Sequence, residues 1–248
     1  MTSDSPKLSG RTAVVTGGSR GIGLAVAEAL LAAGANVVIT GRDQSHLREA
    51  SAQLSKGGRA GRVHTEVADV GRAPEAASAI TAAVTKFGGL DILINNAGVG
   101  VFASVADMGV EDWQQTIDTN LSGVFYCCHA AVPEMRKRGG GWIINISSLA
   151  GKNSFINGAA YCASKAGLNA FSEALMLEVR QENIRVSYVM PGSVSTSFGR
   201  GDGPGGPAAD WKLTADDIAQ VVMDLIAHPA RSLPSRVEIR PSRPPVKK

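Results

Sequence analysis

The sequence predicts an α/β fold in which a mostly parallel sheet of about seven strands is covered by helices on both faces. Short apolar runs of strand length alternate along the chain with longer runs of helical spacing. A glycine-rich loop joins the first of these strands to the first helix. The chain has 248 residues, of which 44% are hydrophobic, and this suffices for one sizeable core. We therefore expect a single doubly wound, three-layer domain over residues 1–248.

The alternation predicts where each element lies. Strands are expected near residues 11–16, 36–40, 62–67, 90–94, 142–148, 184–190 and 236–239. Helices are expected near residues 24–33, 43–55, 73–87, 111–138, 159–180 and 214–228. Pro133 should kink or interrupt the long 111–138 helix near its end. In such a sheet ligands bind at the carboxyl ends of the strands.

Composition limits the classes of partner. The 25 basic and 22 acidic residues leave a formal charge of +3, and the one basic cluster lies in the tail 240–248, so no nucleic-acid surface is expected. Three cysteines and four histidines show neither a disulfide framework nor metal-ligand spacing. No apolar run reaches the roughly 18 residues that a membrane span needs. We expect a cytoplasmic protein without metal or membrane partners, with tails at 1–8 and 241–248.

The first strand leads into the loop Gly17-Gly-Ser-Arg-Gly21-Ile-Gly23. Glycines at these three positions let the backbone turn sharply and approach a ligand closely, while the amides at the following helix N-terminus attract a phosphate. The loop lacks the Gly-Lys-Ser/Thr ending of a nucleoside-triphosphate site. A dinucleotide is therefore the predicted ligand.

The end of the second strand indicates which dinucleotide. Units of this kind commonly carry an acidic residue here that binds the ribose 2′-hydroxyl, but this chain has Gly41 and then Arg42. A guanidinium suits a 2′-phosphate, and Arg20 in the glycine loop can approach the same group from the other side. The sequence thus favours NADP(H). NAD(H) stays the alternative, because Asp43 follows directly and both arginines could be ordinary exposed residues.

A catalytic pair is predicted at Tyr161 and Lys165, which are four residues apart and share one face of the 159–180 helix. A nearby ammonium would lower the phenol pKa from its usual value of about 10 towards a working range. Ser148, thirteen residues before the tyrosine, could hold a substrate oxygen. Strand alternation should turn Ser147 to the opposite face. For the pair in isolation, an amphipathic helix edge is the competing interpretation.

Three further features leave alternatives open. Asn120 either caps local backbone groups or holds a water, and the residues alone favour the structural role.

The glycine- and proline-rich stretch 198–213, within a flexible loop of about 193–213, predicts a lid over substrate or a plain disordered loop. A second stripe on the 159–180 helix predicts a subunit interface or packing within the chain. The stripe consists of Ala159, Ala163, Ala166, Ala170, Ala174 and Leu177.

In this order and spacing, the motifs resemble those of the short-chain dehydrogenase/reductase family, and are similar to its 3-oxoacyl-acyl-carrier-protein reductase-like members. The resemblance is clear from about residue 8 to 196 and looser to 239. The motifs are Thr16-Gly-Gly-Ser-Arg-Gly-Ile-Gly23, Asn95-Asn96-Ala97-Gly98, Asn120, Ser148, Tyr161-x-x-x-Lys165 and Pro191-Gly192. It implies a Rossmann-type fold and hydride transfer between a nicotinamide and a ketone, a 3-oxoacyl group or a secondary alcohol. The alternatives are an NAD-linked alcohol or hydroxysteroid dehydrogenase and a nucleotide-sensing regulator without turnover.

The resemblance also implies residue roles. Tyr161 would be the general acid/base, Lys165 would lower its pKa and bind the nicotinamide ribose, Ser148 would orient the substrate oxygen, and Asn120 would hold a relay water. Asp69 and Val70 would contact adenine, and Val194 and Thr196 the carboxamide. The cofactor contacts it implies are Gly17, Ser19, Arg20, Gly21, Ile22, Gly23, Arg42, Asp69, Val70, Asn96, Ala97, Gly98, Tyr161, Lys165, Pro191, Gly192, Val194 and Thr196.

A homo-oligomer is the last implication. The family suggests a homotetramer built from the helices around Asn120 and Tyr161, which agrees with the stripe of small residues. The C-terminal tail departs from the family pattern, because it reads Arg-Pro-Ser-Arg-Pro-Pro-Val-Lys-Lys where many members have a glycine-containing segment. The sequence therefore leaves tetramer and dimer open.

Overall fold

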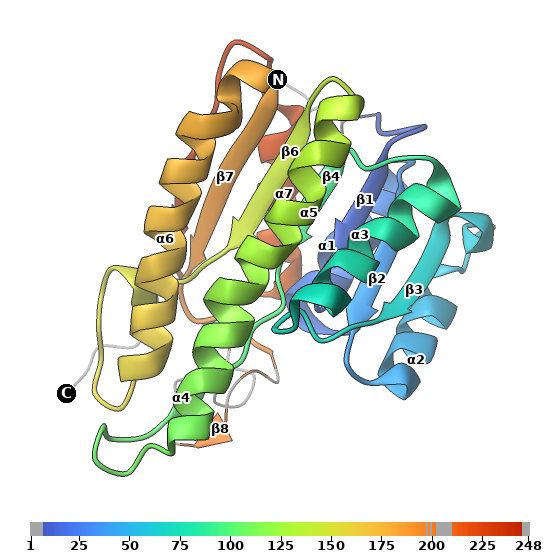
Figure 1. Cartoon of the computed structure of the whole chain (residues 1–248). Helices are drawn as coiled ribbons and strands as arrows, with labels where there is room; N and C mark the ends of the chain where they lie inside the picture. Colours follow the sequence, from blue (N-terminus) through green and yellow to red (C-terminus); the bar gives the residue numbers. More distant parts are fainter. Residues whose placement is uncertain (1–6, 197, 199, 202–209, 245–248) are drawn as a thin grey trace.

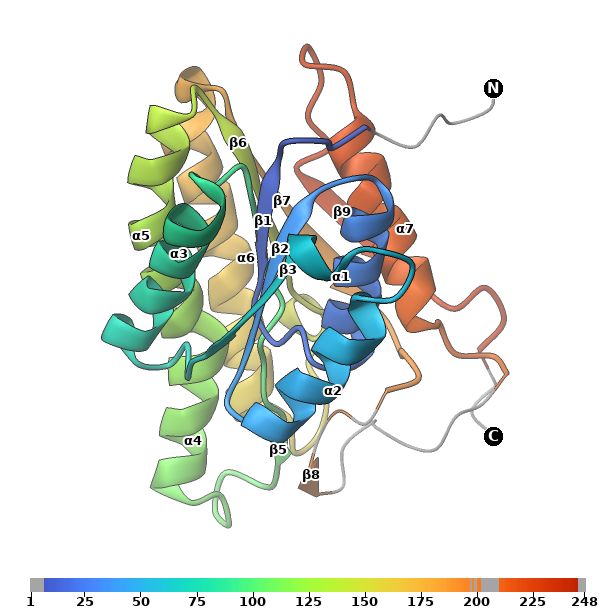
Figure 2. The same cartoon turned by 90° about the vertical axis from the view of Figure 1, so that its right-hand side faces the viewer.

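The computed structural model describes residues 7–196, 198, 200–201 and 210–244. Seven strands form one sheet in the order β3-β2-β1-β4-β6-β7-β9, and every neighbouring pair is parallel. Helices cover both faces of this sheet (Figures 1 and 2). The predicted three-layer, doubly wound Rossmann-type architecture is confirmed.

The elements lie close to their predicted positions. The strands of the large sheet are β1 (Thr12–Val15), β2 (Asn36–Gly41), β3 (Val63–Val67), β4 (Ile92–Asn95), β6 (Gly141–Ile146), β7 (Ile184–Pro191) and β9 (Arg236–Ile239). The helices are α1 (Gly21–Ala32), α2 (Gln44–Leu54), α3 (Ala73–Phe87), α4 (Val110–Ile117), α5 (Gly123–Lys137), α6 (Ala159–Val179) and α7 (Ala215–Ala227). Two short strands that the sequence did not indicate, β5 (Val101–Phe102) and β8 (Arg200–Gly201), pair with each other.

Two hydrophobic clusters lie on opposite faces of the sheet. Strand β1 shows how the alternation of side chains feeds both, since Ala13 and Val15 belong to one cluster and Val14 to the other. Helices α1, α2 and α7 contribute to the first cluster, and α3, α5 and α6 to the second. Figure 2 shows these two groups of helices on either side of the sheet. Burial on both faces explains why the central strands β1 and β4 are almost continuously apolar, whereas the edge strands β3 and β9 also carry charged residues.

The strand order reverses beside β1. From β1 the chain runs outward through β2 and β3, and then returns to place β4 on the other side of β1. At such a reversal, the loops that leave neighbouring strands diverge to opposite faces and open a crevice at the carboxyl ends. The loops after β1, β4 and β6 all begin at this edge, so the fold places the predicted motifs close together.

The long helix predicted over 111–138 differs from the structure. It is divided into α4 and α5 by a turn of π-helix over Asp118–Ser122, in which the Gly123 amide donates to the Asp118 carbonyl five residues back. Pro133, expected to interrupt the helix, lies inside α5 instead. Pro133 and His129 are both exposed, so the carbonyl that the proline leaves without a helical partner is on the solvent side. The interruption thus falls at predicted site residue Asn120, and π turns are frequent at functional sites.

The predicted tails are too long at both ends. Leu8 is buried, and its amide donates to the Ala33 carbonyl, so the chain is already packed there. Pro241 lies against Gly192, with its Cδ 3.0 Å from where a Cβ of that glycine would be. Most of the predicted lid, including residues 202–209, lies outside the described residues. Within the part of the chain that the structure describes, no helix is long and apolar enough to cross a membrane.

Candidate active site

The glycine loop is tightly closed on itself. Gly17 and Gly21 have φ angles of +62° and +55°, which side chains disfavour. A Cβ on Gly23 would lie 2.3 Å from the Gly17 carbonyl oxygen, so only glycine permits this approach. Among the described residues, no side chain caps the start of α1 at Arg20, and the first turn carries no acidic residue. The free amides and the helix dipole fit a phosphate, as a dinucleotide would provide.

The turn after β4 is joined to this loop by hydrogen bonds to Thr16, a residue to which the sequence reasoning assigned no role. The Thr16 hydroxyl accepts hydrogen bonds from the amides of Asn96 and Ala97, each at 3.0 Å. The Asn96 side chain donates in return to the carbonyls of Thr16 and Gly17. The sequence did contain a signal for this role, because Thr16 places a hydroxyl between a buried strand and the glycine loop. Asn96, Ala97 and Gly17 are thus brought together as predicted.

The segment after β7 reaches the same loop. Gly192 donates its amide to the Ile239 carbonyl at 2.8 Å, and Val194 forms a bridge with Leu213. Thr196 then lies beside Gly21, with its Cγ2 3.4 Å from where a Cβ of that glycine would be. Of the two residues predicted to hold the carboxamide, Thr196 therefore lies at the start of α1, while Val194 lies beside Leu213.

Only some of the residues predicted to bind the adenosine part of the cofactor lie together. Arg42 Nη1 lies 4.0 Å from Asp69 Oδ2, and both side chains are partly exposed. Val70, in contrast, is buried in the core cluster that contains α3 and α5, so its predicted contact with adenine would have to come from its backbone. Ile22 likewise packs against the other core cluster, while Ser19 is half-buried and Arg20 exposed.

Asp43, which weakened the prediction of a 2′-phosphate, has a structural role. Its carboxylate caps α2 by accepting hydrogen bonds from the amides of Ser45 and His46. The hydrogen bond from the Ser45 side chain, followed by that from the His46 amide, lowers the pKa of Asp43 to about 2. Its Oδ1 accepts all of these hydrogen bonds at the helix end, where the helix dipole also favours a negative charge.

Tyr161, Ser148 and Lys165 come together at the end of β6. Tyr161 and Lys165 are buried on α6, and the Ser148 side chain lies close enough to the Tyr161 hydroxyl to affect its pKa. The Lys165 ammonium donates to the Ile146 carbonyl at 2.9 Å and lies 5.8 Å from the centre of the Tyr161 ring. Ser147 points elsewhere and donates to Asn169 at 2.6 Å. The prediction that only one of the two serines faces the tyrosine is confirmed.

Burial dominates the pKa values of this cluster. It raises the pKa of Tyr161 to about 12, against a smaller lowering effect of the hydrogen bond from Ser148. It lowers the pKa of Lys165 to about 8. The expectation of a lowered phenol pKa is therefore wrong for the chain by itself, because both groups are removed from water and the charged form of each is disfavoured. At neutral pH Tyr161 is a protonated phenol, which is the form that can donate a proton.

Both the oxygen and the nitrogen of the Asn120 side-chain amide have hydrogen-bond partners in the protein. Its Oδ1 accepts from the Val99 amide at 2.8 Å, and its Nδ2 donates to the Val99 carbonyl and to Ser164 Oγ. The residue is fully buried in the π turn. These contacts agree with the structural role that the residues alone favoured, and they join the π turn to α6 and to the segment after β4. A relay water at Asn120 stays a prediction.

Asn169 is a second residue that the sequence reasoning missed. Besides accepting from Ser147, it donates through Nδ2 to the Gly151 carbonyl at 3.3 Å. It thereby ties the residues on both sides of Ser148 to α6, one turn beyond Lys165. An amide one helical turn from Lys165 was a signal in the sequence, but its partners could be known only from the packing of the loop.

The buried ammonium predicts how stability depends on pH. Because the pKa of Lys165 is about 8 in the folded chain and 10.5 is its ordinary value, the folded state binds fewer protons between these values. Stability should therefore rise with pH through this window and be lost as pH falls through about 8. Urea denaturation measures the free energy of unfolding of wild type and of Lys165→Met. We expect the difference, wild type minus variant, to grow by about 2 kcal/mol from about pH 7 to about pH 9.5. A difference that stays constant would contradict the burial of the charged amine.

Comparisons with known proteins agree with this geometry. The family model described as short chain dehydrogenase matches residues 11–204. An uncharacterized oxidoreductase of Staphylococcus saprophyticus is 35% identical over 239 residues, covering 95% of this chain and 99% of that protein.

Two solved structures are similar over nearly the whole chain. A metagenomic short-chain oxidoreductase in complex with NADP has a TM-score of 0.83 and 38% identity, covering 96% of this chain and 100% of that one. An alcohol dehydrogenase from the archaeon Thermococcus sibiricus, complexed with 5-hydroxy-NADP, has a TM-score of 0.85 and 26% identity, covering 95% and 99%. With a family model matched over most of its length and relatives aligned nearly end to end, this chain belongs to the short-chain dehydrogenase family.

Proposed function

We propose that the protein is an NADP(H)-dependent oxidoreductase that interconverts a ketone or 3-oxoacyl carbonyl and the corresponding secondary alcohol. The observation that carries the proposal is the buried cluster of Tyr161, Ser148 and Lys165, which lies at the same edge of the sheet as a glycine loop suited to a dinucleotide. The nicotinamide would supply or accept the hydride, and the chain would supply position and the proton.

The residues of the chain handle the substrate oxygen. The hydroxyl of Ser148 lies near that of Tyr161, so a substrate oxygen placed between them would bind both. In reduction the Tyr161 proton passes to the substrate oxygen, and the phenolate that remains is stabilised by the Lys165 ammonium. In oxidation the same proton returns. Ser148 is held for this role by its own hydrogen bond from the Ala150 amide at 3.1 Å.

Arg42 and Arg20 support NADP(H) over NAD(H). Both side chains are exposed beside the predicted adenosine site, and Asp43 is engaged at the start of α2. The similar metagenomic oxidoreductase was solved in complex with NADP, which adds support by likeness. The ion pair between Arg42 and Asp69 at 4.0 Å leaves the guanidinium free to bind a phosphate as well.

Removal of the proposed acid separates binding from chemistry. Tyr161→Phe keeps the ring and its packing but has no proton to donate, so NADPH affinity should change by less than about threefold, whereas turnover of a reducible ketone falls at least about a hundredfold. Calorimetric titration with NADPH and the rate of NADPH oxidation measure the two effects. Retained turnover would contradict the assignment of Tyr161.

The arginines should determine cofactor preference. Arg20→Ala and Arg42→Ala each remove a charged donor from the 2′-phosphate, so we expect the dissociation constant for NADPH to rise about tenfold or more, with less than about a threefold change for NADH. Fluorescence titration of both cofactors at one salt concentration measures this, with the exposed Arg180→Ala as control. Equal losses for both cofactors would favour an NAD-linked alcohol or hydroxysteroid dehydrogenase.

We also propose that the protein forms a homo-oligomer through the face made by α5 and α6. Ala170 and Ala174, in the second half of the stripe, are exposed in the described chain, which supports an interface between subunits over packing within the chain. Large apolar side chains accompany them, with Leu177 on α6 56% exposed and Phe125 on α5 48% exposed. An apolar face of this kind with small residues suits close helix packing between subunits.

Charge introduced into this face should separate the subunits. We expect light scattering to give wild type a multiple of the 25.6 kDa chain mass, and Ala170→Arg the mass of one chain. Ala52→Arg, on the exposed side of α2, serves as the control and should keep the wild-type mass. A wild-type protein that is monomeric at micromolar concentration would refute this interface.

A further inference from the structure

Aromatic side chains gather around the proposed acid. Two of the six phenylalanines of the chain, Phe102 and Phe198, lie next to Tyr161, and a third, Phe155, lies next to Phe102. The ring centres of Phe102 and Phe198 are 5.7 Å and 5.6 Å from that of Tyr161. Phe155 contacts the far side of the group, with its ring centre 5.8 Å from that of Phe102. These three residues are called the phenylalanine wall below.

The wall is separate from the cores of the fold. Phe102, Tyr161 and Phe198 belong to a small third cluster, which the two large clusters on the sheet faces do not include. The three phenylalanines come from three distant segments: strand β5, the loop before α6 and the stretch after β7. The pairing of β5 with β8 brings the first and the last of these segments together. Packing of the main core therefore does not account for the wall.

Two glycines make room for the rings. A Cβ on the buried Gly100 would lie 2.8 Å from ring atoms of both Phe102 and Phe198. A Cβ on Gly158 would lie 2.7 Å from the ring of Phe155. The backbone is thus shaped so that each ring can occupy its place beside the tyrosine.

Tyr161 has both apolar and polar neighbours. The cluster that packs with its ring consists of Phe102, Ala150, Cys162 and Phe198. The polar groups nearby are the Ser148 hydroxyl and the Lys165 ammonium, which donates to the Ile146 carbonyl. A substrate group that leaves water to lie against the rings would gain if apolar and lose hydrogen bonds if polar.

We propose that the phenylalanine wall selects carbonyl substrates that carry an apolar group of ring size next to the carbonyl, over those that carry hydroxyl or charged groups there. The inference rests on the proposed function, because it takes Tyr161 as the group that meets the carbonyl oxygen. Phe198 and Phe102 flank the tyrosine and would contact the group next to the carbonyl, and Phe155 would contact its outer end. Aromatic rings pack well against one another, so aryl ketones are the favoured members of this class.

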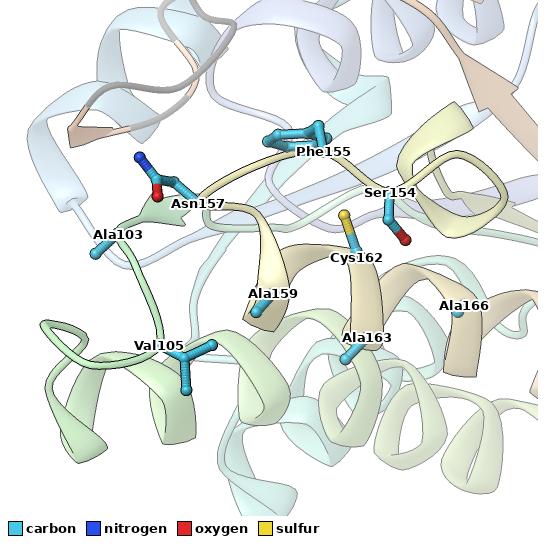
Figure 3. A pocket seen from close by; sticks show the side chains of 9 residues that line it. All are labelled: Ala103, Val105, Ser154, Phe155, Asn157, Ala159, Cys162, Ala163 and Ala166. Carbon is cyan, nitrogen blue, oxygen red and sulfur yellow. The ribbon is translucent and has the colours of Figure 1, made fainter.

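Phe155, at the outer end of the wall, also borders a cavity. A cavity of about 460 Å³ lies between the start of α6, the loop before it and the segment after β5, and Phe155 is among its lining residues. Figure 3 shows Phe155 on this loop above the Cys162 side chain, with Ala159, Ala163 and Ala166 along the helix. Ring size is therefore limited by Phe155, and a smaller residue there would add the space behind it.

The test compares two ketones in each variant, so that their different intrinsic reactivities cancel. Steady-state kcat/KM with NADPH is measured for acetophenone and for dihydroxyacetone. We expect Phe198→Ala to lower the value for acetophenone by about tenfold or more, as the loss of one buried ring face implies, with less than about a threefold change for dihydroxyacetone. The control is Ile156→Ala, which replaces a neighbouring apolar side chain that is 91% exposed, and it should change neither value. Equal loss for both ketones in Phe198→Ala would overturn the proposal.

A larger ketone tests the outer end of the wall. Phe155→Ala should raise kcat/KM for 2-acetylnaphthalene relative to acetophenone by about fivefold or more, because the cavity behind the ring becomes available. Phe155 is 37% exposed, so its replacement endangers the fold less than that of the buried Phe102. An unchanged or lowered ratio would overturn the assigned limit on ring size.

A binding measurement separates failure of this inference from failure of the proposed function. In Tyr161→Phe loaded with NADPH the turnover should be at least about a hundredfold slower, so the heat measured on adding acetophenone reports mainly binding. Weaker binding in Tyr161→Phe/Phe198→Ala than in Tyr161→Phe supports the wall even if wild type reduces no ketone, an outcome that would overturn only the proposed function. Reduction that depends on Tyr161, together with equal acetophenone binding in both variants, would overturn only the wall.

Discussion

A buried ammonium is the constraint on which the site depends. Lys165 is only 4% exposed, and removing its charge from water costs enough to lower its pKa to about 8. The chain partly offsets this cost with the Ile146 carbonyl at 2.9 Å and the nearby Tyr161 ring. Both partners must stay in place, so the end of β6 and the first turns of α6 have to be fixed relative to each other. The Ser147 and Asn169 hydrogen bonds supply that fixation on the side of Ser148.

The same constraint explains why the π turn lies where it does. Asn120 connects the turn to Val99 on one side and to Ser164, the neighbour of Lys165, on the other. A regular helix through these residues would change the position of this amide relative to α6. Gly98 lies between them, where a Cβ would be 3.3 Å from Asn120 Oδ1 and 3.9 Å from the Lys165 nitrogen. The proposed acid, its lysine and the dinucleotide loop are therefore parts of one hydrogen-bonded frame.

Sequence reasoning reached the fold and most of the frame because both follow from local patterns. Strand and helix periods place the elements, and parallel strands bring Gly17, Asn96, Ser148 and Tyr161 to one edge. What it missed depends on distant contacts. The π turn replaced an interruption expected at Pro133, since local propensity does not record that Asn120 has partners on two other segments. The raised pKa of Tyr161 was missed for a related reason. Spacing shows that a lysine is near, but only packing shows that both side chains are buried away from water.

Direct observation of the Tyr161 phenol tests this account at its centre. The chain contains only three tyrosines, so ¹³C labelling at tyrosine Cζ gives three signals that Tyr161→Phe assigns. For the protein alone, the account predicts that the Tyr161 signal titrates with a pKa of about 12. With NADP⁺ it predicts a lower pKa, because a bound nicotinamide would bring positive charge near the proposed acid. A phenol already ionised below its ordinary pKa of 10.0 without cofactor, or one that does not respond to NADP⁺, would contradict the account.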